Sequence, residues 1–213
     1  MKVEAVTVCI NFSKYLKQCL SNKDLLDRWI IITHELDEDT IALCKENDLE
    51  YVLSKRIYEK GAPFAKGKAI NEGLELLDKD DWLLQLDGDI ILPSNFRNLV
   101  AGKGLDGEGK GFRDTNRLYG ARRYLKSDPS KELKYMCNSN SGMERLCIGF
   151  FQLWHSSILK EYPQISNNAR FDDHVMMLFY RDELHNTPTV MENMKLIDVS
   201  EVVKEFHEGI KEK

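Results

Sequence analysis

Two aspartates separated by a single glycine, Asp87 and Asp89, directly follow the run Trp82–Leu86. A mostly apolar run of this length is typical of a buried strand. A rigid strand end can hold two carboxylates ready for a hard divalent cation, which prefers oxygen ligands. Such a cation can neutralise the charge of a diphosphate. The same three residues can also form an ordinary surface turn, so the surrounding sequence has to decide between a metal site and a turn.

Three other kinds of site that use paired acids fit this stretch less well. A calcium-binding EF-hand loop requires an acid or an amide at its fifth position, where Ile91 stands. A phosphatase of the haloacid dehalogenase type usually has its Asp-x-Asp near the N-terminus, with Thr or Val in the place of Ile91. A nucleotidyltransferase has a glycine- and arginine-rich loop after its first strand, and residues 9–14 contain neither glycine nor arginine.

The elements that would position the two aspartates alternate between strand and helix. Apolar strands are predicted at four places: Val3–Ile10, Trp29–Thr33, Glu50–Ser54 and Trp82–Leu86. Amphipathic helices are predicted between them, the first after a cap at Asn11 or Ser13, the second from about Asp39 and the third over Ala65–Asp78. This alternation indicates an α/β fold, a mostly parallel sheet with helices on both faces. Ligands bind beyond the carboxyl ends of such strands, where Asp87 and Asp89 stand.

The second half of the chain is less regular. Residues 102–111 contain five glycines and match the pattern GxGxxG, but they follow a predicted helix, so they indicate a loop rather than a dinucleotide site. The predicted elements are a short helix at Asn95–Ala101 capped by Ser94, strands at Arg117–Leu125, Cys147–Trp154 and Met194–Ser200, and a helix at Asp172–Arg181. No linker divides the chain, which predicts a single domain over residues 1–213.

Charge and cysteine usage disfavour several classes of protein. The chain has 213 residues, and its formal net charge of −5 does not favour non-specific binding to nucleic acid or to an anionic membrane. Its five cysteines are odd in number and contain no CxxC, which indicates reduced thiols rather than disulfides or a zinc site. No run approaches the roughly 20 apolar residues of a membrane span. We therefore expect a cytoplasmic protein with no transmembrane segment.

Five segments stand in the order found in a known enzyme family. They are VTVCIN (6–11), KGKAINEGLELL (66–77), LLQLDGDIILP (83–93), GFFQLW (149–154) and ARFDDHVMMLFYRD (169–182). In this order the chain resembles the metal-dependent nucleotide-sugar glycosyltransferases of the GT-A fold, particularly the inverting family 2. The resemblance implies one GT-A domain with a Rossmann-like sheet, in which residues 1–100 form the nucleotide-sugar-binding half and residues 101–213 the acceptor-side half.

The resemblance also implies which residues would bind the metal and the donor. Asp87 and Asp89 would hold Mn²⁺ or Mg²⁺ against the donor diphosphate, and His207 would supply a further ligand. The donor-side residues would be Asn11, Thr33, His34, Lys66, Lys68, Asn71, Asp87 and Gly88. Thr33 and His34 stand where the family usually has an aspartate near the base. The two lysines also lie near a predicted helix N-terminus, where partial positive charge favours phosphate, although both can simply be solvated.

The resemblance places the sugar and the acceptor against the second half of the chain. Trp154 would stack on a sugar ring and Gln152 would bond a sugar hydroxyl, although strand aromatics in this segment also suit a core. Asp173, with Asp172 before it, would act as the general base on the acceptor hydroxyl. The simpler alternative for these two acids is a cap at the start of the predicted helix. His207 likewise fits the spacing of an amphipathic C-terminal helix.

Together these residues predict a metal-dependent glycosyltransferase that moves a sugar from a nucleotide-diphosphate donor, a UDP-sugar in the first place, with inversion. The acceptor is open among a glycan, a lipid-linked sugar, a protein and a nucleic-acid base. Two alternatives remain. One is a phosphohydrolase that uses the same Asp-x-Asp metal site, and the other is a protein that binds nucleotide sugars without turnover.

Overall fold

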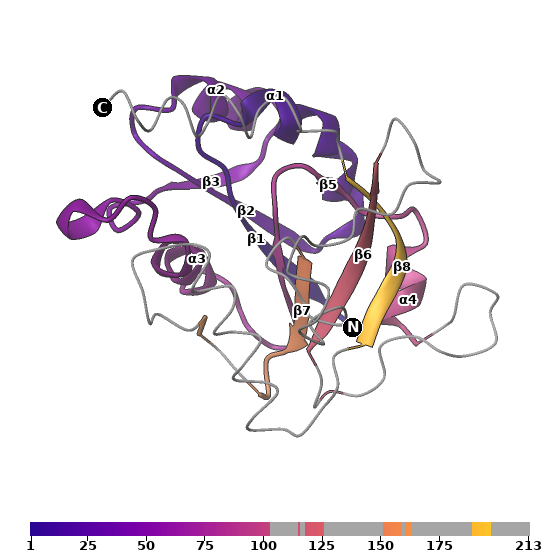
Figure 1. Cartoon of the computed structure of the whole chain (residues 1–213). Coiled ribbons are helices and arrows are strands. Elements are labelled where there is room, and N and C mark those ends of the chain that lie inside the picture. Colours follow the sequence, from indigo (N-terminus) through magenta and orange to yellow (C-terminus); the bar gives the residue numbers. More distant parts are fainter. Residues whose placement is uncertain (103–114, 116–117, 126–150, 159–160, 163–188, 197–213) are drawn as a thin grey trace, which may run out of the picture.

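The computed structural model describes residues 1–102, 115, 118–125, 151–158, 161–162 and 189–196 (Figure 1). Their strands form one eight-stranded sheet in the order β3-β2-β1-β4-β7-β6-β8-β5. The strands are β1 (Val3–Val8), β2 (Arg28–Thr33), β3 (Glu50–Leu53), β4 (Trp82–Leu86), β5 (Ile90–Ile91), β6 (Tyr119–Leu125), β7 (Phe151–His155) and β8 (Thr189–Leu196). The helices are α1 (Ser13–Leu16), α2 (Glu38–Glu46), α3 (Lys66–Leu74) and α4 (Phe96–Val100), with 3-10 helices η1 (Lys17–Leu25) and η2 (Glu59–Gly61).

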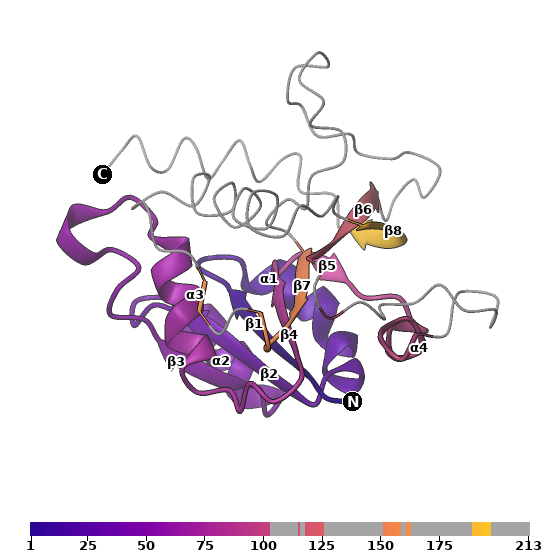
Figure 2. The ribbon, with the colours of Figure 1, turned by 90° about the horizontal axis from the view of Figure 1, so that it is seen from below.

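The half of the sheet built from the first four long strands is parallel. β1 pairs with β2 and with β4, and β2 pairs with β3, all in parallel. β7 joins β4 antiparallel, and β6 joins β7 antiparallel. β8 and β5 continue the sheet from there, and Figure 2 shows β6 and β8 at the end of the sheet away from β3.

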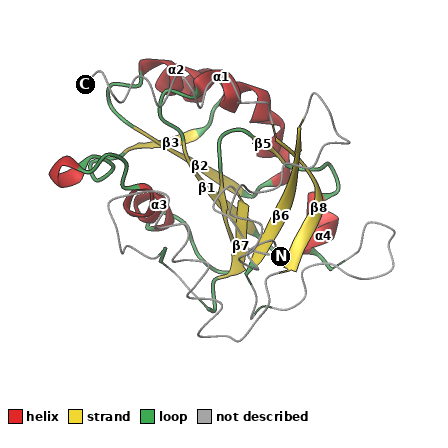
Figure 3. Ribbon diagram, viewed as in Figure 1, coloured by secondary structure: helices red, strands yellow, loops and turns green. Residues whose placement is uncertain are grey.

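Helices cover both faces of the parallel half (Figures 1 and 3). On one face Ile70 of α3 packs in a cluster with Val6 of β1. On the other face Leu16 of α1 packs in a second cluster with Ala5 of the same strand. Strands buried on both faces are apolar throughout rather than alternating, which explains the continuous apolar runs in the sequence. The predicted α/β class, with a mostly parallel sheet and helices on both faces, is confirmed.

Helix α3 approaches the sheet closely at Gly73. A Cβ built on Gly73 would lie 2.7 Å from Cγ1 of Val6 and 3.0 Å from Cδ1 of Ile32. Glycine inside a helix costs about 1 kcal/mol relative to alanine, and here it permits a distance that no larger residue could keep. The close packing sets the first residue of α3, Lys66, within 2.9 Å of Asp87 at the end of β4.

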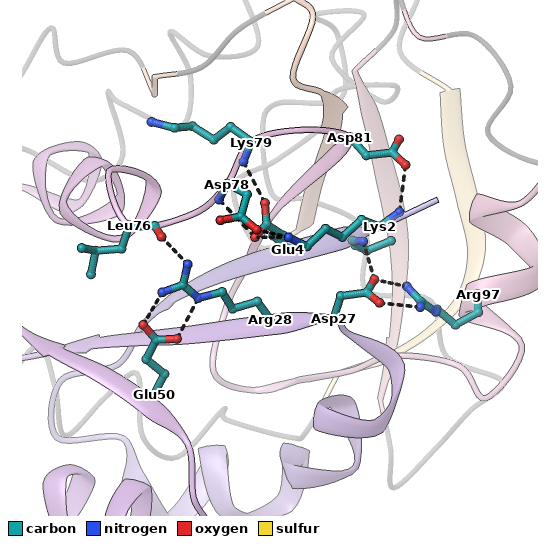
Figure 4. A network of polar contacts seen from close by, with 11 residues as sticks. Lys2, Glu4, Asp27, Arg28, Glu50, Leu76, Asp78, Lys79, Asp81 and Arg97 are labelled. Atoms are coloured by element: carbon teal, nitrogen blue, oxygen red, sulfur yellow. Dashed lines mark hydrogen bonds and ion pairs between the residues drawn. The ribbon is translucent and has the colours of Figure 1, made fainter.

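Charged side chains form a network of hydrogen bonds and ion pairs at the amino-terminal edge of the parallel strands (Figure 4). Glu4 on β1 is buried and accepts hydrogen bonds from the backbone N–H groups of Asp78 and Lys79, at 3.2 and 2.9 Å. Arg28 at the start of β2 donates to both carboxylate oxygens of Glu50 at the start of β3. The bonds of Arg28 join the starts of β2 and β3, and the bonds of Glu4 join β1 to the loop before β4.

A second ion pair at this edge joins α4 to the sheet. Asp27, just before β2, accepts two hydrogen bonds from the guanidinium of Arg97 and one from the backbone N–H of Val3 at 2.6 Å (Figure 4). The hydrogen bonds from Arg97 lower the pKa of the Asp27 carboxyl below its ordinary value. The pair holds the short helix α4 against the start of the chain.

Two predicted helix caps are wrong. The first helix has only four residues before it continues as the 3-10 helix η1, and its N-cap is Phe12, which makes no side-chain cap hydrogen bond. Neither Asn11 nor Ser13 caps it, because Asn11 turns the chain with a left-handed backbone (φ 57°) and donates its own N–H to Asp37. Asn95 rather than Ser94 is the N-cap of α4, again without a side-chain cap bond.

The other predicted elements agree in position or lie outside the described residues. α3 ends at Leu74, before the predicted end at Asp78, although Leu77 is still buried. β8 ends at Leu196 and overlaps only the start of the predicted last strand. The predicted helix at 172–181, the start of the predicted strand at 147–150 and the glycine-rich segment beyond residue 102 lie outside the described residues.

The cysteines that the structure describes are buried and free, as predicted. Burial raises the pKa of the Cys9 thiol to about 12 and that of Cys44 to about 11. Neither is therefore a thiolate nucleophile at neutral pH. Cys137 and Cys147 lie outside the described residues.

The described helices also bear on membrane insertion. Among the residues that the structure describes, no helix has both the length and the apolarity to cross a membrane.

Candidate functional site

The carboxyl ends of β2, β1 and β4 lie next to one another at one edge of the sheet, because these strands are neighbours and parallel. Three predicted site residues stand at these ends. Thr33 is the last residue of β2, Asn11 follows β1 and Asp87 follows β4. The structure therefore brings the Asp-x-Asp to the edge at which α/β sheets bind ligands.

Asp87 is held by two side chains that bond the same carboxylate oxygen. Lys66 Nζ and Gln85 Nε2 each lie 2.9 Å from Oδ1 of Asp87. Gln85 precedes Asp87 by two residues, and its neighbour Leu83 packs in the cluster under α3, so all three project toward that helix. Lys66 is buried, whereas the side chain of Asp87 is 34% exposed. Within the described part of the chain no hydrogen bond reaches Oδ2, which leaves that oxygen for a ligand.

The rest of the Asp-x-Asp turn is compact. The backbone N–H of Ile90 donates to the carbonyl of Asp87 at 3.3 Å, and Asp89 is partly exposed. A Cβ on Gly88 would lie 3.6 Å from both Cys9 Sγ and Thr7 Cγ2, an ordinary contact distance. Space alone does not require glycine between the acids, so the donor contact of Gly88 stays a prediction.

Among the predicted donor-side residues of α3, Lys66 contacts the Asp-x-Asp through its bond to Asp87. Lys68 lies 3.3 Å from a carboxylate oxygen of Glu59 in η2. Asn71 is buried, and its amide donates to the carbonyl of Tyr162 at 2.7 Å and accepts from the Tyr162 N–H at 2.6 Å. Asn71 thus ties α3 to the segment after β7, and its predicted role on the donor side stays a prediction.

A buried aspartate that the sequence reasoning missed ties the strand ends together. Asp37 accepts from the Asn11 N–H at 2.7 Å and from the Thr33 hydroxyl at 3.0 Å, both on Oδ2. Its Oδ1 accepts from the Thr40 N–H at 3.2 Å, so Asp37 is also the N-cap of α2. The signal was present, because an aspartate directly before a predicted helix is a favoured N-cap residue. Thr33 is buried, and its hydroxyl proton is taken by this bond.

His34, predicted on the donor side, lies beside an aromatic residue from another segment. Its ring lies edge-on to that of Tyr58, with centroids 5.2 Å apart. Tyr58 is 42% exposed, and neighbouring Leu36 is 80% exposed. Burial and the charge of Asp37 raise the pKa of the Tyr58 hydroxyl, so the ring is neutral at physiological pH. The partly exposed His34 ring and the exposed Tyr58 ring therefore lie together beyond β2.

The two predicted sugar-side residues of β7 are buried. Trp154 has no exposed surface and packs in the cluster under α3, with its ring 6.4 Å from that of Tyr162. A ring without an exposed face cannot stack on a sugar, so the structure assigns Trp154 to the core. Gln152 is equally buried and accepts a hydrogen bond from the Tyr162 hydroxyl at 2.6 Å. Both residues project to the α3 face because they alternate along β7, opposite Leu83 and Gln85 of β4.

The remaining predicted site residues, Asp172, Asp173 and His207, lie outside the described residues. In the part of the chain that the structure does describe, no three metal-binding side chains gather in one place. Two carboxylates are too few for a self-contained site, but they suit Mg²⁺ or Mn²⁺, which commonly take one or two carboxylates and complete their shell with phosphate oxygens and water. The donor set therefore fits an ion that is shared with a phosphate ligand.

No protein-family model and no curated protein matches this sequence. Solved structures do match the fold. Glucosyl-3-phosphoglycerate synthase from Mycobacterium tuberculosis in complex with Mg²⁺ and uridine-diphosphate matches with a TM-score of 0.58 at 15% identity, over 92% of this chain and 69% of that one. The same enzyme with Mn²⁺ and uridine-diphosphate-glucose gives a TM-score of 0.57 at 13% identity, over 92% and 69%. Mannosyl-3-phosphoglycerate synthase from Rubrobacter xylanophilus gives 0.58 at 13% identity, over 93% and 67%.

The chain has the GT-A fold. The predicted resemblance to GT-A glycosyltransferases is confirmed at the level of the fold, which is what similarity at such low identity establishes. The Asp-x-Asp turn after β4, with Lys66 beside it, lies at the carboxyl edge of the parallel strands, where sheets of this class generally bind ligands.

Proposed function

We propose that the protein is a metal-dependent glycosyltransferase that uses a nucleotide-diphosphate sugar, with a UDP-sugar as the first choice. The observation that carries the proposal is the state of Asp87. One of its oxygens is held by Lys66 and Gln85, and the other accepts no hydrogen bond from the described residues at the carboxyl edge of a parallel GT-A sheet. The mycobacterial enzyme with the same fold was solved with Mg²⁺ and uridine-diphosphate, which supports this choice of metal and nucleotide.

Three features of the chain would receive the donor diphosphate. Asp87 and Asp89 provide carboxylate oxygens for Mg²⁺ or Mn²⁺, and the bound ion would neutralise charge on the departing diphosphate. Lys66 adds a fixed positive charge within 2.9 Å of Asp87. It stands at the N-terminus of α3, where the partial positive charge of a helix start favours phosphate.

The nucleoside would lie beyond the ends of β1 and β2. Asp37 fixes the backbone there through Asn11 and Thr33. The edge-on pair of His34 and Tyr58 offers exposed ring surface to a planar base. Because both carboxylate oxygens of Asp37 accept internal hydrogen bonds, the choice of nucleobase would depend on the backbone groups and rings around it.

The general base of the transfer remains the sequence-based proposal of Asp173, next to Asp172. A base has to come within about 3 Å of the acceptor hydroxyl. Exchange of Asp173 for asparagine should leave donor binding intact and lower transfer by ~10²-fold or more. Loss of transfer on Asp172→Asn instead would move the role to its neighbour.

The experiment that tests the proposed function is a donor screen. The purified protein is incubated with UDP-, GDP- and dTDP-sugars, with and without Mn²⁺, and released nucleotide is measured. Metal-dependent release of UDP from a UDP-sugar is the expected result. Release of phosphate from simple phosphate esters would indicate the phosphohydrolase, and metal-dependent binding without any release would indicate a binding protein.

A control variant distinguishes an effect on the site from an effect of losing any one negative charge. Asp80 is an exposed aspartate just before β4, at the opposite end of the strand from Asp87. Asp80→Asn removes one negative charge next to the same strand and should leave nucleotide release unchanged. Release that fell equally in Asp80→Asn and Asp87→Asn would contradict the site.

A further inference from the structure

Gln85 is a buried amide of which only one half is bonded. It has no exposed surface and stands in a strand whose other residues, from Trp82 to Leu86, are apolar and buried. Its Nε2 donates to Oδ1 of Asp87 at 2.9 Å. Its Oε1 is buried and has no hydrogen-bond partner among the described residues.

Core stability does not explain this residue. A buried acceptor without a partner is unfavourable, and an apolar side chain of the same size would avoid that penalty. The amide cannot gain a partner by turning over, because its oxygen would then face Oδ1, which only accepts hydrogen bonds when Asp87 is ionised. The bond to Asp87 therefore fixes the orientation of Gln85 and leaves Oε1 without a partner.

The contact constrains Asp87 in a way that Lys66 alone cannot. Lys66 is a point charge on a flexible four-carbon stem, whereas Gln85 is locked within the sheet, opposite Gln152 of β7. Because both donors reach the same oxygen, they restrict the rotation of the carboxylate. They also leave Oδ2 without a hydrogen bond within the described part of the chain.

We propose that Gln85 is a positioning residue that, with Lys66, anchors Oδ1 of Asp87 so that Oδ2 is presented to a divalent ion and the phosphate that it binds. The inference rests on the proposed function, since it assigns Gln85 a role at that same site. Groups that orient a metal ligand from behind typically change metal affinity by about 10–100-fold when they are removed.

The test is calorimetric and does not depend on turnover. Gln85→Met keeps the length of the side chain and removes the amide. We expect Mn²⁺-dependent binding of UDP to weaken by roughly 10-fold or more, while UDP binding in EDTA stays unchanged. We also expect the thermal midpoint to hold or rise, because the unpartnered buried acceptor is gone.

Thr7→Val is the matched control. Thr7 on β1 is buried and accepts a hydrogen bond from Trp29 Nε1 at 2.8 Å, so the exchange also removes a buried polar group of the parallel sheet. Its partner Trp29 belongs to the cluster on the face away from α3. We expect Thr7→Val to lower the thermal midpoint and to leave Mn²⁺-dependent UDP binding as in the wild type.

Three other outcomes would each contradict the positioning role of Gln85 or the proposed function. Wild-type-like binding by Gln85→Met would overturn the positioning role and leave the proposed function standing. A Gln85→Met protein that does not fold would show that the amide supports the core, and would overturn the inference equally. Absence of Mn²⁺-dependent UDP binding in the wild type itself would overturn the proposed function, and the inference with it.

Discussion

The two edges of the parallel sheet are built in opposite ways. At the amino-terminal edge Glu4, Arg28 and Asp27 each have charged or backbone partners, and the bonds join strand to strand (Figure 4). At the carboxyl edge Gln85 has a buried oxygen without a partner among the described residues, and Oδ2 of Asp87 accepts no hydrogen bond from them. A buried polar group without a partner lowers stability, so it persists where another role requires it. We interpret the amino-terminal edge as the one that supports stability and the carboxyl edge as the one where the proposed ligand binds.

The largest effect that would test this contrast is expected at Asp87. Asp87→Asn removes charge from the carboxylate that would hold the metal, and transfer should fall by roughly 10²–10³-fold, measured as UDP release. The protein should stay folded, because Asp87 is a third exposed and the loss of its pair with Lys66 costs less than the loss of a fully buried pair. Full activity of Asp87→Asn would contradict the proposed functional role of the carboxyl edge.

The counterpart at the amino-terminal edge is Glu4→Ala. This exchange leaves two backbone N–H groups, of Asp78 and Lys79, without their buried acceptor, and should lower the free energy of unfolding by about 3 kcal/mol in chemical denaturation. Nucleotide release per folded molecule should not change. Asp78→Ala is the control, since its side chain is more than half exposed and its pair with Lys2 is screened by solvent, so this exchange should change stability much less.

Asp37 lies at the carboxyl edge, and we expect it to contribute both to stability and to donor binding. Asp37→Asn can keep only one of the two accepting oxygens, so we expect a loss of about 1–2 kcal/mol in stability. The turn at Asn11 should loosen as well, and the KM for the nucleotide donor should rise. Asp39→Asn changes an exposed acid in the same first helical turn and should alter neither quantity. A stable Asp37→Asn protein with an unchanged KM would place Asp37 outside both roles.

The smallest effect is expected from acid titration of the pair of Asp27 and Arg97. The pair lowers the folded-state pKa of Asp27, so its stabilisation is present above the ordinary aspartate pKa of about 4 and is lost as the pH falls through the lower folded value. Because both side chains are about one third exposed, the contribution should be below about 1 kcal/mol. Between pH 7 and pH 3 the free energy of unfolding, measured by chemical denaturation, should change less in Asp27→Asn than in the wild type. An equal difference would mean that the pair is screened by solvent.

Much of the parallel half could be predicted from local sequence. The runs Val3–Ile10 and Trp82–Leu86 are apolar because both faces of their strands are buried, and that pattern needs no knowledge of partners. The caps were predicted less well. Asn11 has a capping side chain, but its backbone turns the other way because a distant carboxylate, Asp37, takes its N–H.

Residue types and their order along the chain determined the strand before Asp87, the turn through Asp89 and the α/β alternation, because burial and backbone propensity act over a few neighbouring residues. Only the tertiary structure decided which groups meet. Lys66 reaches Asp87 because Gly73 lets α3 lie against β1. Trp154 belongs to the core because the register of β7 on β4 sets it opposite Leu83, under that helix. Such contacts depend on register and on the distance between packed elements, and neither is encoded within one short segment.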